Sequence, residues 1–271
     1  MPICYDADYI ASIHFIRTLN IHLDNYIIFK QNSGCKYNKE YTVLKNFICF
    51  LKNNHIKSYP EINEEFVLSW INRSKKIKGI TKNHYLRRVK YFFKYLRRIK
   101  EVSYNPTEKI EPFKTTPFIP YIYTIEELKK IFSEIRSRMN YPGNYYRGLT
   151  YYTMFFLVYA LGLRIGEALR IKIKDINFKE KTIFISKSKF YKERLIPFSK
   201  CVHNKLKLFR NERLKRFPKI NSAPLFINDW GTICNKSNVE RRWSVIVRDC
   251  GIKTRNGKTP RIHDLRHSAA T

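Results

Sequence analysis

The sequence predicts a mainly α-helical protein with one small β-sheet, divided into two units. Three observations predict this. Apolar residues recur at helical spacing through the first hundred positions, prolines cluster between positions 106 and 120, and two short β-branched segments occur between positions 182 and 197. The chain has 271 residues, a length that suits two domains of ordinary size. Its balance of 44% hydrophobic and 28% charged residues excludes a wholly disordered protein.

The first unit is predicted to consist of helices joined by short polar connections. Apolar positions fall at helical spacing in five groups, each bounded by polar residues. The last group opens at Thr81 and forms a single apolar stripe that includes Tyr85, Val89 and Leu96. The five predicted helices lie around positions 10–16, 23–29, 43–51, 64–71 and 81–96.

A proline-rich segment separates the two units. Proline removes a backbone donor and disfavours helix at the residue before it, so four prolines close together predict a semi-extended connection. These prolines are Pro106, Pro112, Pro117 and Pro120. The predicted organisation is a helical unit over residues 1–110, a linker over 111–122 and a second unit over 123–271.

The second unit is predicted to mix helices with a small sheet. Thr124 and Glu127 have the spacing of a capping box, which predicts a helix start there and an end near Arg138. Gly162 is placed to end an apolar helix, and another helix begins near Arg164. Strands are expected over 182–185 and 195–197, and further helices over 148–161, 200–216, 237–250 and the last eight or so residues.

The net charge of +31 at pH 7 points to a polyanionic partner. The chain has 53 Lys and Arg against 22 Asp and Glu, and both halves are basic, +11 over residues 1–114 and +20 over 115–271. A/T-rich codons account for some of the lysine, but they do not favour arginine equally. Nucleic acid, specifically double-stranded DNA, is therefore the expected partner. A membrane partner is not expected, because the longest apolar run, 149–163, is too short to span a bilayer.

The predicted helix that opens at Thr81 has one uniformly basic face. Between Arg73 and Lys100 the sequence contains 12 Lys or Arg and no acidic residue, whereas solvated helix faces normally mix the two signs. A nucleic-acid role is therefore predicted for this region. The candidate DNA-binding residues are Arg73, Lys75, Lys76, Lys82, Arg87, Arg88, Lys90, Lys94, Arg97 and Arg98.

The six cysteines indicate a reducing, intracellular compartment. No two of them form a C-x-x-C pair, and they are scattered among apolar neighbours, where cysteine acts as a small hydrophobic residue. Cys201 and His203 have no further ligands nearby in the sequence, so no metal site is predicted there.

Three segments of the second unit place basic residues where charge alone does not explain them. Arg164 lies between apolar residues, so it needs a partner, either Glu167 one turn on or an anionic ligand. A lysine-rich turn follows, S-K-S-K-F-Y-K-E-R-L-I-P over 186–197. His263 and Arg266 share a helix face in H-D-L-R-H-S-A-A-T, while His263 and His267 at i,i+4 leave a metal pair as the weaker alternative.

These segments, A-L-G-L-R-I-G-E-A-L, K-F-Y-K-E-R-L-I-P and H-D-L-R-H-S-A-A-T, resemble in order and spacing the motifs of the tyrosine recombinases, or phage integrase family, and are Xer-like. The resemblance implies a helical, SAM-like core-binding domain before the linker and a catalytic α+β domain after it. It also implies that Arg164, Lys189, His263 and Arg266 surround one DNA phosphate, with Lys187 as the fallback for Lys189. Glu167 and His267 are expected to support them.

The resemblance implies metal-free and cofactor-free strand cleavage and rejoining through a 3′-phosphotyrosine. Arginines stabilise the phosphate charge, and a lysine beside them is suited to protonate the leaving oxygen. The family's tyrosine follows the H-x-x-R motif, and none of the 19 tyrosines here does, so the chain is expected to be C-terminally incomplete and to bind DNA without cleaving it. An inactive DNA-binding regulator of the same fold is the alternative. Other protomers bound to the same DNA are expected partners. The protein itself is expected in the cytoplasm, associated with the nucleoid.

Overall fold

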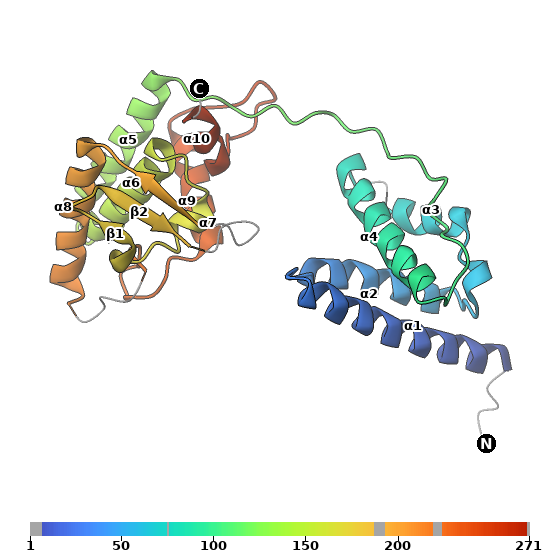
Figure 1. Cartoon of the computed structure of the whole chain (residues 1–271). Coiled ribbons are helices and arrows are strands. Elements are labelled where there is room, and N and C mark those ends of the chain that lie inside the picture. The colour runs from blue at the N-terminus through green and yellow to red at the C-terminus, as the bar shows by residue number, and fades with distance from the viewer. Residues whose placement is uncertain (1–6, 75, 187–192, 219–223, 270–271) are drawn as a thin grey trace, which may run out of the picture. The chain divides into compact units, whose positions relative to one another are not determined.

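The computed structural model describes residues 7–74, 76–186, 193–218 and 224–269. Over these residues the chain is mainly α-helical with one three-stranded antiparallel sheet, which confirms the predicted fold class. The chain separates into two compact units, Met1–Pro117 and Phe118–Thr271 (Figure 1). The boundary between the units falls inside the proline-rich segment. Among the described residues, no helix has the length and apolarity needed to cross a membrane.

Where the structure describes it, residues 7–74 and 76–117, the first unit contains four α-helices and one short 3₁₀ turn. Helix α3 begins where the Asn63 side chain accepts a hydrogen bond from the backbone N–H of Phe66, a regular N-cap. The sequence predicted each of the later helices to within a few residues. The elements are α1 (Ala7–Asn32), α2 (Asn38–Asn53), η1 (Tyr59–Glu61), α3 (Glu64–Asn72) and α4 (Gly79–Arg98).

Helix α1 replaces the first two helices that the sequence predicted. It runs without interruption through 26 residues, including the positions 17–22 that separated the two apolar groups. Those positions contain neither glycine nor proline, and Leu19 within them is buried, so nothing there ends a helix. The prediction of two helices was wrong because a few polar residues on the outer face resembled a connection.

The core of the first unit forms where α2, α3 and α4 meet, with α1 packed against α2 and α4. Phe47 and Trp70 are fully buried, and their rings contact edge to face at 4.9 Å. The linker begins on the surface of this unit. Asn83 of α4 exchanges two hydrogen bonds with the backbone of Phe113, and Gly79 lies so close to the carbonyl of Lys114 that a Cβ would be only 2.4 Å from it.

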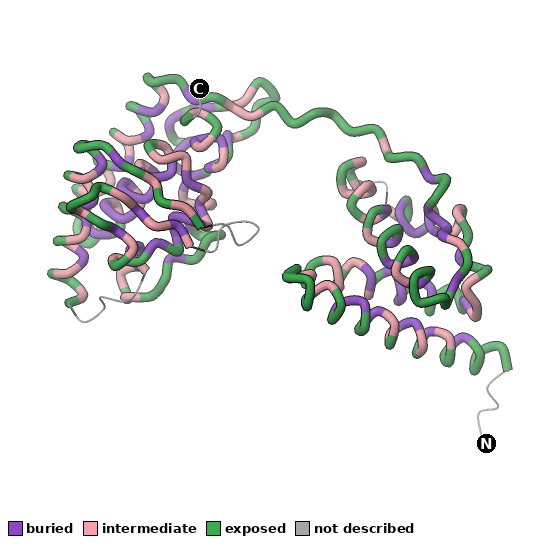
Figure 2. Tube along the Cα trace, in the orientation of Figure 1, coloured by how far each residue is buried: buried purple, intermediate pink, exposed green. Residues whose placement is uncertain are grey.

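The second unit surrounds the apolar helix α6, against which α5, α8 and α10 pack. Figure 2 shows that buried residues run along the helices in the middle of this unit. The sheet has the order β1-β2-β3, with Ile183 opposite Ile196 and Ile185 opposite Arg194. The elements are α5 (Ile125–Met139), α6 (Tyr145–Ala160), α7 (Ile165–Ala168), η2 (Ile173–Asp175), β1 (Ile176–Asn177), β2 (Thr182–Ile185), β3 (Arg194–Pro197), α8 (Lys200–Arg216), α9 (Lys236–Asp249) and α10 (Ile262–Ser268).

Candidate functional site

Arg164 lies in the tight turn between α6 and α7. Gly162 ends α6 with a φ of 58°, the left-handed conformation that glycine adopts without strain. Leu163 and Ile165, on either side of Arg164, are buried in the core of the unit. They fix the turn and leave the Arg164 side chain 41% exposed at its surface.

The carboxylate of Glu167 is the centre of the candidate site. Its side chain is only 1% exposed. One oxygen accepts a hydrogen bond from Arg164 Nη1 at 2.9 Å, and the other accepts one from the backbone N–H of Arg164, also at 2.9 Å. Of the two partners that the sequence allowed for Arg164, the structure therefore shows Glu167.

Two further arginines reach the same carboxylate from distant parts of the chain. Arg194, the first residue of β3, donates from Nη1 to Oε1 at 3.2 Å and from Nη2 to Oε2 at 2.9 Å. Arg266 of α10 brings Nη1 to within 3.8 Å of Oε2. Three guanidinium groups thus share one carboxylate, which leaves an excess of two positive charges.

The pKa values reflect this arrangement. Burial by itself raises the pKa of Glu167, but hydrogen bonds from Arg194 and Arg164 outweigh burial and lower that pKa to about 2. Burial and the neighbouring Arg164 cation lower the pKa of Arg266. Arg266 Nη1 is buried and has no hydrogen-bond partner among the described residues. A buried cationic donor without an acceptor is costly, so this atom is suited to receive an anion.

His263 lies one turn before Arg266 on α10. Ile262 and Leu265 are buried and fix the helix, which leaves His263 and Arg266 half-buried on its other side. Burial and the charge of Lys236 lower the pKa of His263. In the described residues, no hydrogen bond or ion pair links His263 to the three arginines.

The remaining predicted site residues are His267 and Lys189. His267 follows Arg266 at an exposed position. Lys189 and its fallback Lys187 lie outside the described residues. Strands β2 and β3, which precede and follow these residues, are described. The last described pair of the two strands is Ile185 with Arg194, and Arg194 donates to Glu167. No group of three or more His, Cys, Asp or Glu side chains able to hold a metal ion occurs in the part of the chain that the structure describes.

Sequence reasoning missed Arg194. It was read only as part of the lysine-rich segment, although it makes more hydrogen bonds to Glu167 than Arg266 does. A signal was present, because Arg194 directly precedes the strand predicted over 195–197. In the structure it begins β3 and pairs with the buried Ile185. The pairing partner of a strand residue depends on the register of the two strands, which cannot be read from the sequence.

The predicted DNA-binding residues of the first unit divide into two groups. The side chains of the first group contact other residues of the same unit. Arg88 forms an ion pair with Glu40 of α2 at 2.6 Å, and Arg97 pairs with Glu108 at 2.7 Å. The others with internal contacts are Arg73 over the ring of Trp70, Lys82 on the Asn72 side chain and Arg98 over the ring of Phe29.

The second group is exposed on α4. Arg87, Lys90 and Lys94 are three and four residues apart, so they share one helix face, and none of them forms an ion pair within the described ranges. Lys76, before the helix, is also exposed, and Lys75 lies outside the described residues. We call Arg87, Lys90 and Lys94 the α4 stripe.

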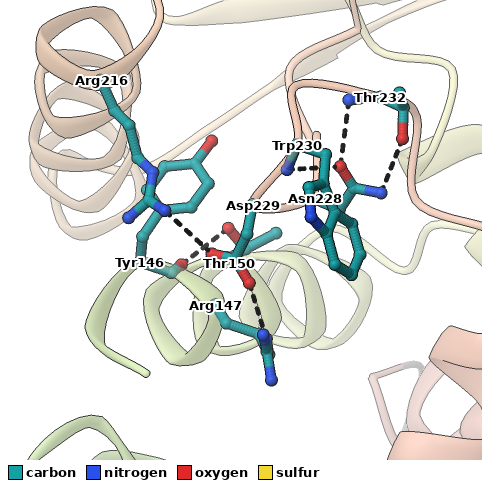
Figure 3. Close-up of polar contacts among 8 residues, drawn as sticks. All are labelled: Tyr146, Arg147, Thr150, Arg216, Asn228, Asp229, Trp230 and Thr232. Carbon is teal, nitrogen blue, oxygen red and sulfur yellow. Dashed lines mark hydrogen bonds and ion pairs between the residues drawn. The ribbon is translucent and has the colours of Figure 1, made fainter. Parts of the chain in front are cut away.

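A second polar cluster of the second unit lies away from Glu167. Asp229 accepts a hydrogen bond from Arg147 of α6 at 2.7 Å and lies 3.6 Å from Arg216 of α8, as Figure 3 shows. It ties the loop before α9 to two helices. The cavity beside it, about 520 Å³, is lined by Trp230 and Arg242 among others and by none of the predicted catalytic residues.

Comparison with known proteins decides the family. The model of the phage integrase family matches residues 124–271, more than half of the chain. The chain belongs to the phage integrase family. It is 30% identical over 192 residues to tyrosine recombinase XerA of Pyrococcus horikoshii, covering 70% of this chain and 58% of that protein. It is 24% identical to tyrosine recombinase XerC of Syntrophus aciditrophicus, over 92% of this chain and 81% of that protein.

Solved structures of integrases and recombinases have the same fold. The Tn1549 transposon integrase, solved in complex with transposon right end DNA, matches with a TM-score of 0.69 and 18% identity over 93% of this chain and 84% of that one. The XerH site-specific recombinase, bound to a palindromic difH substrate, matches with a TM-score of 0.63 and 21% identity over 83% and 67% of the two chains. The phage integrase fold therefore extends over most of this chain.

Proposed function

We propose that this protein has the DNA-binding and phosphate-stabilising functions of a site-specific tyrosine recombinase. The single observation that carries the proposal is the convergence of Arg164, Arg194 and Arg266 on Glu167, with a buried donor of Arg266 lacking an acceptor. The related structures named above are solved with DNA, and this chain, at +31, is suited to the same ligand.

The chemistry follows from the charges of the site. A phosphodiester under attack gains negative charge on its non-bridging oxygens, and fixed guanidinium groups stabilise that charge better than mobile water does. Glu167 holds each arginine by part of its donor set only, which leaves the other N–H groups for the phosphate. His263, on the same helix face as Arg266, is suited to a hydrogen bond with the phosphate or the nucleophile. Lys189 is assigned the proton transfer to the leaving oxygen by motif position.

We further propose that these 271 residues bind duplex DNA without becoming covalently attached to it. Covalent catalysis by this family requires a tyrosine, and every tyrosine of the sequence precedes Arg266. The alternative, an inactive regulator with the same fold, shares this property. The recombinase and the regulator differ in one respect: only in the recombinase does the arginine site still activate a phosphate when an external nucleophile is supplied.

DNA binding is tested by fluorescence anisotropy of a labelled duplex at several salt concentrations. The affinity is expected to fall by roughly 10³–10⁵ between 50 and 200 mM salt if about 6–10 phosphates are contacted. The Arg266→Gln variant should weaken binding about tenfold or more, whereas Arg248→Gln, which removes an exposed arginine of α9, should change it less than threefold. A salt-independent affinity contradicts the proposal.

The covalent step is tested separately with a nicked duplex that traps a phosphotyrosine. The full chain alone should yield no protein–DNA adduct on a denaturing gel. Hydroxylamine or a tyrosine peptide supplied as an external nucleophile should give slow strand cleavage that Arg164→Gln abolishes, which favours the recombinase over the regulator. An adduct formed by the chain alone refutes the non-covalent assignment, and no rescue by any nucleophile favours the regulator.

A further inference from the structure

Helix α1 presents isoleucines to the outside of the first unit. Ile10, Ile21 and Ile28 are 56%, 54% and 54% exposed. At 3.6 residues per turn, their spacing of 11 and 7 residues places them within about 20° of one line along the helix. Leu19 and Leu23, on the opposite side, are buried in the core. Figure 2 shows exposed residues along the length of α1, alternating with the buried ones.

The same helix carries no net charge, which is unusual in a chain of +31. Its 26 residues contain two acidic and two basic side chains. Asp8 is engaged by Lys57 at 2.6 Å, and Lys30 lies over the rings of Tyr26 and Phe29. A surface that binds DNA or anionic lipid is basic, and this one has no net charge. A helix that exposes several large apolar side chains among polar ones, here Ile10, Ile13, Ile21 and Ile28, is suited to contact with another protein.

Two charged side chains beside the isoleucines, Arg17 and Asp24, indicate which protein makes this contact. Arg17 and Asp24 lie on one side of the isoleucine line, seven residues and therefore about 10 Å apart along the helix. That separation prevents them from pairing with each other, and neither forms an ion pair among the described residues. They are, however, placed symmetrically about a point near Ile21.

This symmetry is the pattern of a self-complementary surface. If a second copy of α1 packs antiparallel about a two-fold axis near Ile21, Arg17 of each copy lies beside Asp24 of the other, so two ion pairs form. The same arrangement sets Ile21 near its own counterpart and brings Ile28 onto the exposed Ile13 of the second copy. Isologous interfaces have this property, that residue i meets j while j meets i.

We propose that the exposed face of α1 is a self-association surface, on which a second copy of this chain packs through the same helix in antiparallel orientation. The proposal does not depend on strand cleavage or on the arginine site. Because each copy carries +31, their mutual repulsion opposes the contact at low salt. Raising the salt concentration therefore strengthens self-association while it weakens DNA binding.

Sedimentation velocity of the full chain, over a range of protein concentrations at 0.15 and 0.5 M salt, tests the proposal. We expect a monomer–dimer equilibrium that favours the dimer at the higher salt. The variant Ile21→Lys should weaken dimerisation at least tenfold. Ile80→Lys changes an isoleucine of similar exposure on α4 and should leave the dimer within twofold of the wild type. A monomer at every concentration and salt overturns the proposal, as does equal loss in both variants.

A charge swap tests the orientation. Arg17→Asp and Asp24→Arg each place like charges together in the antiparallel pair, so each should weaken the dimer several-fold. The double variant restores opposite charges at both contacts and should recover most of the wild-type dimer. Failure of the double variant to recover excludes the antiparallel pairing. If Ile21→Lys changes the sedimentation coefficient without any dependence on concentration, the face is covered within one chain and the proposal is wrong.

Discussion

The two units arrange their positive charges in opposite ways. In the first unit, Arg87, Lys90 and Lys94 are spread along one exposed face of α4, about one helical turn apart. Arg88 and Arg97 are each paired with a separate acidic residue. In the second unit, three arginines from different elements converge on the single buried carboxylate of Glu167. Spread charges are suited to a long polyanion, whereas convergent charges are suited to a single anionic group.

The difference has an energetic consequence. The side chains of the α4 stripe are exposed and form no ion pair within the described residues, so replacing them should have little effect on folding. Removing a buried carboxylate that compensates several cations costs much more, because the cations remain partly desolvated. The second unit therefore depends for its stability on the same residues that form its candidate site.

The largest expected effect comes from Glu167. In the Glu167→Gln variant the three arginines lose their compensating charge, so we expect the free energy of unfolding of the second unit to fall by about 3 kcal/mol. Calorimetry measures the loss, and hydrogen exchange of α6 and α10 against α4 assigns it to a unit. Glu180→Gln, an exposed control, should change stability by less than about 0.5 kcal/mol. A transition that moves equally in both variants contradicts a central role for Glu167.

Acid provides a reversible form of the same test. The folded-state pKa of Glu167 is about 2, below its ordinary value of 4.5, so its stabilising contribution is complete above pH 4.5 and is lost as the pH falls towards 2. The difference in stability between the wild type and Glu167→Gln should therefore be constant from pH 7 to about 5 and shrink below that. Urea unfolding at each pH measures it. A difference that stays the same down to pH 2.5 shows that the arginines do not hold the carboxylate ionised.

The sequence predicted most of the fold because its signals are local. The capping box of Thr124 and Glu127 is present as predicted, and α8 spans the predicted residues. Local signals failed at α1, where a continuous helix was read as two, because the polar residues between the apolar groups lie on an outer face that only the packed structure reveals.

The candidate site was predictable in part for the same reason. Arg164 and Glu167 are three residues apart, so the sequence alone suggested their pairing. Arg194 reaches Glu167 from 27 residues away through the register of β2 and β3, which no local pattern encodes. The basic helix was identified by composition, but its partners Glu40 and Glu108 lie on other segments, so only the structure separates paired arginines from exposed ones.

A smaller effect is expected at Arg194. Lysine keeps the charge but cannot form the two-point contact with Glu167, so Arg194→Lys should lower the stability of the second unit by about 1 kcal/mol, and Arg194→Gln by about 2 kcal/mol. The same calorimetric measurement applies. Arg255→Lys, which changes an exposed arginine, is the matched control and should have no measurable effect. If Arg194→Lys also leaves the stability unchanged, the contact between Arg194 and Glu167 does not stabilise the site.

The smallest effect on stability, and the most direct contrast between the units, is expected on α4. Replacing Arg87, Lys90 or Lys94 with Ala should leave stability within about 0.5 kcal/mol but lower the slope of log affinity against log salt by about 1 for duplex DNA. Arg88→Ala should do the reverse, since Arg88 is occupied by Glu40: a loss of up to about 1 kcal/mol in the first unit and little change in slope. If all four variants change the slope equally, the internal ion pair opens on DNA and the division of α4 into paired and exposed cations fails.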